Sequence, residues 1–180
     1  MSADWKVIRR ESLLTSYVFS VERRVVDTGT EELVRDVVLH RGAVAIVAVD
    51  DLERVGVIRQ YRVALEREHY EIPAGSVEEH EGDLLAVAVR ELREEMGCEA
   101  QAWRPIGTFL NSPGWTNQTI AIFEARGLTH MPRQTMGPEE ATSTIEWWDR
   151  DQCRSFLSSS GPIDATTTIG LQHFLWASGD

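Results

Sequence analysis

The segment from Asp83 to Gly97 constrains the fold of this 180-residue chain more than any other part of its sequence. On a helix that advances about 100° per residue, its apolar side chains fill one arc and three carboxylates fill the adjoining arc. The apolar residues are Leu84, Leu85, Ala88, Val89, Leu92 and Met96, and the acids are Glu91, Glu94 and Glu95. We therefore expect an amphipathic helix from about Asp83 to Met96 with its acids at the border of the core.

The crowding of Glu91, Glu94 and Glu95 points to a cation. Three carboxylates on one strip of a helix repel one another and raise their own pKa values unless a positive charge lies between them. A divalent ion is a natural counter-charge, and ligands made only of oxygen favour a hard ion such as Mg²⁺, with Mn²⁺ as an alternative. The competing interpretation is a solvated acidic helix face, which is common among Glu clusters.

The rest of the chain alternates between strand and helix patterns. Strand patterns cover residues 17–23 and 32–39, separated by a turn at Asp27, and an apolar run at 43–49 is typical of a buried central strand. Further strands are expected at 55–62, 103–110, 119–125 and 144–148, and helices at 149–158 and 166–176. This order favours an α/β fold with a mixed sheet between helices, preceded by a small N-terminal antiparallel sheet.

The residues around the acidic helix resemble the signature of the Nudix hydrolase family. Matches in residue type and order are Gly75, Glu81, Arg90, Glu91, Leu92, Glu94, Glu95 and Gly97, while Cys98 stands where an aliphatic residue is usual. Between Glu81 and Arg90 lie eight residues where the pattern has seven, so that counting back from Arg90 places Gly82 at the loop Glu position. The role of Glu81 therefore stays open.

The resemblance implies a fold and a metal site. The fold is the α/β/α sandwich of the family, which we expect over residues 41–180, and metal binding is implied for Glu91 and Glu95, with Glu94 beside them, and for the backbone carbonyl of Ala74. Gly75 has no Cβ, which lets the chain turn and present that carbonyl. Arg90 lies four residues before Glu94 and can pair with it, although an ordinary surface pair is the alternative.

Several segments resemble one branch of the family, the ADP-ribose pyrophosphatases and related nucleoside-diphosphate-sugar hydrolases. They are Arg59–Arg62, Glu71–Gly75, Ser112–Gly114 and the tail that begins at Gly161 with the sequence GPIDATTT. The likeness implies Mg²⁺-dependent cleavage of a pyrophosphate to a nucleoside monophosphate and a sugar phosphate. It also implies that residues 1–40 pair two subunits into a homodimer and help to hold the nucleotide, whereas the alternative is that these strands only extend a monomer.

The branch also suggests further site residues. A loop Glu commonly serves as general base, which here means Glu140 or, second, Glu139, the only acids between Met136 and Ile145. Substrate contacts are expected from Arg59 and Arg62, which we place on one side of a strand, from Trp115 by stacking, and at Gln118, where relatives usually have Glu. Surface arginines, a packed aromatic and a solvated loop are the plain alternatives for these residues.

Two other function classes stay open. One is a non-catalytic sensor of ADP-ribose or a related nucleotide, and the other is an enzyme of the same family acting on nucleoside triphosphates or dinucleoside polyphosphates. A net charge of −11 argues against a nucleic-acid partner. The sequence shows no apolar run long enough to span a bilayer, and its first residues do not have the pattern of an export signal. We therefore expect a cytoplasmic protein with no membrane partner. Its two cysteines, Cys98 and Cys153, are expected to be buried thiols.

Overall fold

The computed structural model describes residues 5–134, 137 and 141–177, and the chain forms two compact units. The first unit combines residues 1–42 with residues 109–120, and the second combines residues 43–108 with residues 121–180. The candidate metal ligands all belong to the second unit, and each unit is considered by itself below.

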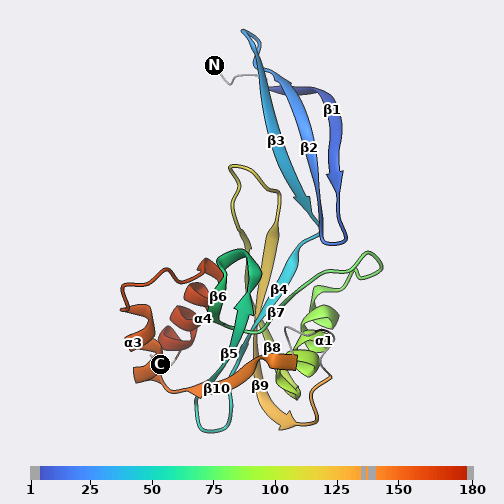
Figure 1. Cartoon of the computed structure of the whole chain (residues 1–180). Helices are drawn as coiled ribbons and strands as arrows, with labels where there is room; N and C mark the ends of the chain where they lie inside the picture. The colour runs from blue at the N-terminus through green and yellow to red at the C-terminus, as the bar shows by residue number, and fades with distance from the viewer. Residues whose placement is uncertain (1–4, 135–136, 138–140, 178–180) are drawn as a thin grey trace. The chain divides into compact units, whose positions relative to one another are not determined.

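The first unit is built on an antiparallel sheet in the order β1-β2-β3 (Figure 1). Its strands are β1 (Lys6–Thr15), β2 (Phe19–Asp27) and β3 (Glu32–His40). The turn between β2 and β3 begins at Asp27, whose side chain accepts the amide of Gly29 at 2.8 Å, and Gly29 takes the positive φ of 84° that glycine tolerates. The expected N-terminal antiparallel sheet and its turn are therefore confirmed.

Residues 111–118 complete this unit by lying along the edge of β3. The amide of Val38 donates to the carbonyl of Trp115 at 2.8 Å, and the amide of Asn117 donates back to the carbonyl of Val38 at 3.3 Å. The side chain of Asn117 accepts the amide of His40 at 2.8 Å. The result is a short parallel contact between Val38 and Thr116, which covers part of an otherwise open sheet edge.

The second unit contains two sheets, with strand orders β7-β4-β9-β8 and β10-β5-β6. Their strands are β4 (Ala43–Ala48), β5 (Val55–Arg62), β6 (Arg67–Glu71), β7 (Ala74–Ser76), β8 (Cys98–Leu110), β9 (Thr119–His130) and β10 (Thr144–Trp148), and a 3₁₀ turn, η1 (Val63–Leu65), joins β5 to β6. Strand β9 extends five residues beyond the expected end at Ala125, and Gly127 lies within it with a positive φ of 67°.

Helices lie on both sides of β4, as Figure 1 shows: α1 (Leu84–Met96) on one side, and α3 (Arg150–Leu157) and α4 (Ala165–Trp176) on the other. The alternation of side chains along β4 explains this arrangement. Val44, Ile46 and Ala48 join the core cluster that contains the apolar face of α1. Val47 points the opposite way, toward Gly170 of α4. The expected α/β/α arrangement is confirmed.

Helix α1 begins and ends where its capping residues predict. The side chain of Asp83 accepts the amide of Leu85 at 3.0 Å, and Gly97 takes a left-handed conformation with φ of 59° after the last turn. Its buried apolar residues are Val87, Ala88, Leu92 and Met96. The prediction that Leu84 and Leu85 face the core is wrong, because the core cluster takes up α1 only from Val87 onward and both leucines stay exposed.

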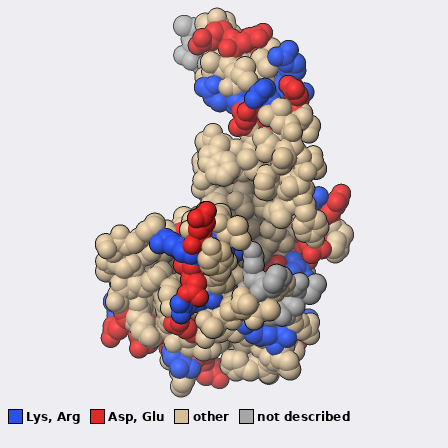
Figure 2. Space-filling view, in the orientation of Figure 1, with Lys and Arg blue, Asp and Glu red and all other residues tan. Residues whose placement is uncertain are grey.

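Charged side chains of opposite sign lie next to one another on the face drawn in Figure 2. Across β2 and β3 of the first unit, Arg23 makes a bidentate pair with Asp36, with both distances 2.8 Å. In the part of the chain that the structure describes, no helix is long and apolar enough to cross a membrane. Cys98 and Cys153 are both buried free thiols, as expected from the sequence.

Candidate functional site

Three pieces of the second unit form the candidate metal centre: strand β7, the loop of residues 77–83, and one face of α1. Glu91 and Glu95 lie one helical turn apart on this face, and they are only 6% and 5% exposed. Buried carboxylates are costly unless polar or positive partners surround them. Their burial distinguishes this pair from the solvated acidic helix face that was the alternative interpretation.

Gly75 lets Glu91 approach β7 closely. A Cβ built on Gly75 would overlap the carboxyl carbon and both carboxyl oxygens of Glu91. Gly75 lies within a strand and is not among the described glycines with positive φ. The glycine is therefore required because the carboxylate packs against its backbone, and the sharp turn expected from the sequence is not the reason.

Glu95 is tied to the backbone of the same strand. One of its carboxyl oxygens accepts the amide of Ala74 at 2.8 Å. This bond fixes the rotamer of Glu95 and sets Ala74 beside the helix face. Ala74, Gly75, Glu91 and Glu95, which were predicted from distant parts of the sequence to share one site, therefore lie together.

Arg90 occupies the centre of the acidic group. Its guanidinium contacts Glu81 at 2.9 Å, Glu91 at 2.8 Å and Glu94 at 2.7 Å. Burial lowers the pKa of Arg90, but the hydrogen bond to Glu81 and the charges of Glu91 and Glu94 outweigh it, so that the pKa is raised well above its ordinary value. The hydrogen bond from Arg90 in turn lowers the pKa of Glu81. Arg90 thus supplies positive charge among the crowded acids, and the predicted pair of Arg90 with Glu94 is present.

The loop before α1 brings Glu81 to Arg90 in spite of its extra residue. The amide of Glu81 donates to the carbonyl of Glu78 at 3.2 Å, and the amide of Glu78 donates to the side chain of Glu81 at 2.8 Å. This tight turn absorbs the additional length. Gly82, which the residue count places at the loop Glu position, is exposed and has open space where a Cβ would point.

The donor set suits a hard divalent cation. Every side chain that faces Arg90 in this group offers carboxylate oxygen, and the overlap of Glu91 with a Cβ at Gly75 shows that the strand is shaped around a carboxylate. Among the described residues, no three Asp, Glu, His or Cys side chains already converge as a complete ligand set. The carboxylates instead meet the guanidinium of Arg90, and the four side chains together carry net negative charge when ionised.

Arg59 and Arg62 lie on β5 and are paired across the hairpin with β6. The expectation that they share one side of the strand is wrong, because residues three apart on a strand point to opposite faces. Arg62 makes a bidentate bond to Glu71, with both distances 2.8 Å, and Arg59 pairs with Glu68. The ring of Tyr70 also lies beneath the guanidinium of Arg59, 5.8 Å from its centroid. The sequence could have shown these acids as partners, because Glu68 and Glu71 fall on the strand that follows the turn at 63–65.

Trp115 and Gln118 belong to the first unit. Trp115 is 56% exposed, so its ring is not packed in a core as the alternative interpretation required. The side-chain oxygen of Gln118 accepts a hydrogen bond from the side-chain amide of Asn111 at 2.8 Å and closes the turn between β8 and β9. The two candidates for general base, Glu139 and Glu140, lie outside the described residues.

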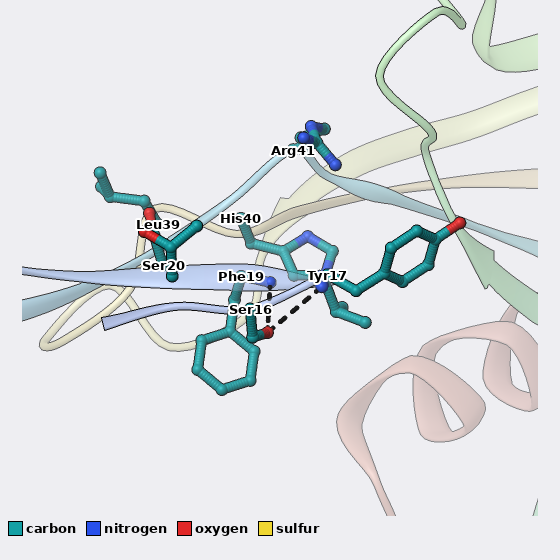
Figure 3. Close-up of a pocket in the computed structure, with 9 residues that line it drawn as sticks. Ser16, Tyr17, Phe19, Ser20, Leu39, His40 and Arg41 are labelled. Atoms are coloured by element: carbon teal, nitrogen blue, oxygen red, sulfur yellow. Dashed lines mark hydrogen bonds between the residues drawn. The ribbon is translucent and has the colours of Figure 1, made fainter.

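The first unit also holds a pocket of about 220 Å³ between the β1–β2 turn and the end of β3 (Figure 3). Tyr17, Phe19, His40 and Arg41 are among its lining residues, and none of the lining residues is acidic. The hydroxyl of Ser16 accepts the amides of Val18 and Phe19, both at 3.3 Å, and so fixes the turn. Burial, with the charge of Arg41, lowers the pKa of His40.

The sequence and the structure of this chain are similar to those of several known proteins. Residues 39–165 match the model of the NUDIX domain. An ADP-ribose pyrophosphatase from Mycobacterium tuberculosis is 35% identical over 81% of this chain and 70% of its own length. A methanol dehydrogenase activator from Bacillus methanolicus is 29% identical over 93% of this chain and 94% of its own. A crystal structure of an ADP compounds hydrolase superposes with a TM-score of 0.82, at 21% identity, covering 97% of this chain and 96% of that one.

Proposed function

Because the chain belongs to the Nudix family of hydrolases, we propose that it cleaves the pyrophosphate of ADP-ribose or a related nucleoside diphosphate sugar with Mg²⁺ as cofactor. ADP-ribose would give AMP and ribose 5-phosphate. Enzymes of this family generally use divalent metals, and the oxygen-only donor set favours Mg²⁺, with Mn²⁺ as a substitute. The names of the relatives support ADP-ribose as the first substrate to test.

One observation carries the proposal: two buried carboxylates, Glu91 and Glu95, lie against a strand that has a glycine where any other side chain would collide with Glu91. A merely structural acidic face needs neither the burial nor the glycine. Burying two carboxylates is costly unless a positive charge compensates, and a cation held between these carboxylates and β7 would supply that charge. We therefore assign metal binding to Glu91, Glu95 and the carbonyl of Ala74, with Glu94 beside them.

The bound metal would polarise the phosphate oxygens and lower the pKa of the attacking water. The chain's own residues have separate roles in this proposal. Arg90 holds Glu94 and Glu91 in fixed rotamers through bonds of 2.7 and 2.8 Å. Glu81 holds Arg90 from the loop side. A carboxylate between residues 136 and 145, Glu140 ahead of Glu139, would take the proton from water.

The chemistry of the substrate contacts follows from the side chains available. Arg59 and Arg62 are charged groups that can meet phosphate if they exchange their carboxylate partners for it. Trp115 offers an exposed ring for stacking, and Gln118 offers an uncharged amide where relatives usually carry Glu. The pocket lined by Tyr17, His40 and Arg41 combines aromatic faces and positive charge without acids, which suits an adenine base and its phosphate.

Activity should be tested with purified protein, Mg²⁺ and a panel that contains ADP-ribose, other nucleoside diphosphate sugars, NAD, dinucleoside polyphosphates and nucleoside triphosphates. We expect nucleoside monophosphate release, fastest from ADP-ribose or a nucleoside diphosphate sugar. Glu95→Gln should lose at least about 100-fold in kcat, while Glu99→Gln, on the exposed start of β8, should keep it. Binding of ADP-ribose without turnover would favour a non-catalytic sensor. A preference for nucleoside triphosphates or dinucleoside polyphosphates would favour the other kind of Nudix enzyme.

We further propose that the chain forms a homodimer in the cytoplasm through the first unit. Strand β1 is an edge strand, and Ile8, Leu13, Leu14 and Val34 on this sheet are large apolar side chains left exposed. A second copy of the chain would cover them. Light scattering should give twice the chain mass, and Leu14→Asp should shift it toward the monomer. A monomeric wild-type protein at micromolar concentration would contradict the dimer.

A further inference from the structure

We propose that Thr167 and Asp164, at the start of α4, are positioning residues that hold the backbone of residues 69–74 where Ala74 and Glu95 can bind metal. This inference rests on the proposed function. It also gives a role to the GPIDATTT tail, which the candidate site described above does not use.

The first contact joins α4 to the segment between β6 and β7. The hydroxyl oxygen of Thr167 accepts the backbone amide of Ile72 at 3.1 Å. Thr167 is fully buried and Ile72 is 1% exposed, so that water cannot replace this hydroxyl. A buried amide left without an acceptor is costly, so the backbone at Ile72 would have to move to recover one.

The second contact joins the same helix to β6. One carboxyl oxygen of Asp164 lies 3.1 Å from Nε2 of His69, and the other accepts the amide of Thr167 at 2.8 Å. The carboxylate therefore caps α4 and holds β6 at once. Thr167 and Asp164 together fix residues 69–72 at two points against the first turn of α4.

Close packing of the helix supports the two polar contacts. A Cβ on Gly170 would lie only 2.7 Å from Cδ1 of Ile72 and 3.1 Å from Cγ2 of Val47. Glycine at this position lets α4 approach the sheet closely enough for the Thr167 hydroxyl to reach the amide of Ile72. Ile72 is thus held by its side chain as well as by its backbone.

The connection from Ile72 to the metal centre is short and stiff. Pro73 follows, with its φ restricted by the ring, and its carbonyl accepts the amide of Ile46 on β4 at 2.8 Å. Ala74 comes next, and its amide donates to Glu95 at 2.8 Å. A shift of Ile72 therefore reaches Ala74 and Glu95 through two peptide units with little freedom to absorb it.

Thr168 provides a matched control on the same helix. Its hydroxyl donates to the carbonyl of Asp164 at 2.9 Å, a bond internal to the first turn of α4. Thr167→Val and Thr168→Val each replace a hydroxyl by a methyl group at nearly constant volume. Only Thr167→Val removes the acceptor of the Ile72 amide.

The experiment measures metal binding directly, by calorimetric titration of the full-length protein with Mn²⁺. We expect Thr167→Val to weaken Mn²⁺ binding about 10-fold and Thr168→Val to change it less than about 2-fold. Thr167→Ser, which keeps the hydroxyl, should bind Mn²⁺ with the affinity of the wild-type protein. Hydrogen exchange of the Ile72 amide should accelerate in Thr167→Val alone, and kcat should fall with little change in KM for ADP-ribose.

The outcomes separate this inference from the proposed function. If the wild-type protein neither binds Mn²⁺ nor hydrolyses any pyrophosphate, the proposed function fails and this inference fails with it. If the wild-type protein binds and hydrolyses but Thr167→Val matches Thr168→Val in Mn²⁺ affinity, only the positioning role is refuted. Should Thr167→Val not fold, Thr167→Ala removes the same acceptor with a smaller side chain, and unchanged Mn²⁺ affinity in that variant would refute the role of Thr167. Asp164→Asn keeps the helix cap and weakens the bond to His69, and unchanged Mn²⁺ affinity there would refute the role of Asp164.

Discussion

Replacing Gly75 by Ala tests the proposed metal centre with a single methyl group. That methyl would overlap the carboxyl group of Glu91, and relieving the overlap to the 3.4 Å of ordinary contact requires a displacement of more than about 1 Å. Glu91 projects from the buried face of α1, so that the carboxylate must rotate away from its position. Misplacing a reacting group by about 1 Å commonly costs about 100-fold in rate, which corresponds to about 2.7 kcal/mol in the activation barrier.

Steady-state kinetics at several Mg²⁺ concentrations, together with thermal unfolding, would measure this effect. We expect kcat to fall about 100-fold and the half-saturating Mg²⁺ concentration to rise, while overpacking costs only about 1–3 kcal/mol of stability. Gly82→Ala, in the loop between β7 and α1, is the matched control, because its Cβ would meet nothing within 4 Å. Wild-type kinetics in Gly75→Ala would show that Glu91 need not stay against β7, and the assignment of Glu91 as a ligand would fall.

Two further predictions concern charge. Burial tends to raise the pKa of Glu124, but bonds from Arg126, Arg104 and His173 lower it overall, so that its stabilising effect is present above its ordinary pKa of 4.5 and is lost as the pH falls through the lowered value. Denaturant unfolding should show Glu124→Gln about 1.5–3 kcal/mol less stable at pH 7, with the difference disappearing in acid; a constant difference down to pH 3 would contradict this. Adding Mg²⁺ at 100 times its Kd should stabilise the wild-type protein by about 2.7 kcal/mol, reversibly with chelator; an equal gain in Glu91→Gln would count against the metal site.

The sequence predicts those helices, strands and contacts that depend only on residues close together in the chain. The helix at 84–96 follows from its apolar periodicity, its Asp83 cap and the glycine that ends it. The strand at 43–48 follows from its uniformly apolar run, because a strand buried on both faces needs no alternation. The spacing of Arg90 and Glu94 likewise predicts that they pair, because side chains four residues apart are neighbours on the surface of a helix.

Contacts between distant segments could not be predicted in the same way. The spacing between Glu81 and Arg90 left their relation open, because a loop can absorb one extra residue in a turn such as that at Glu78. The bond from Ile72 to Thr167 joins residues 95 positions apart, and no local pattern indicates it. The exposure of Leu84 and Leu85 depends on where the helix meets the sheet, which periodicity alone does not give.

The parallel contact of residues 111–118 with β3 has a consequence for synthesis of the chain. Val38 receives its partners, Trp115 and Asn117, only after more than 70 further residues have been made. Because chains are made at about 5–20 residues per second, the edge of β3 stays unpaired for several seconds on the ribosome. The nascent N-terminal strands therefore have an open edge during that interval, when another nascent chain of the same kind can pair with it.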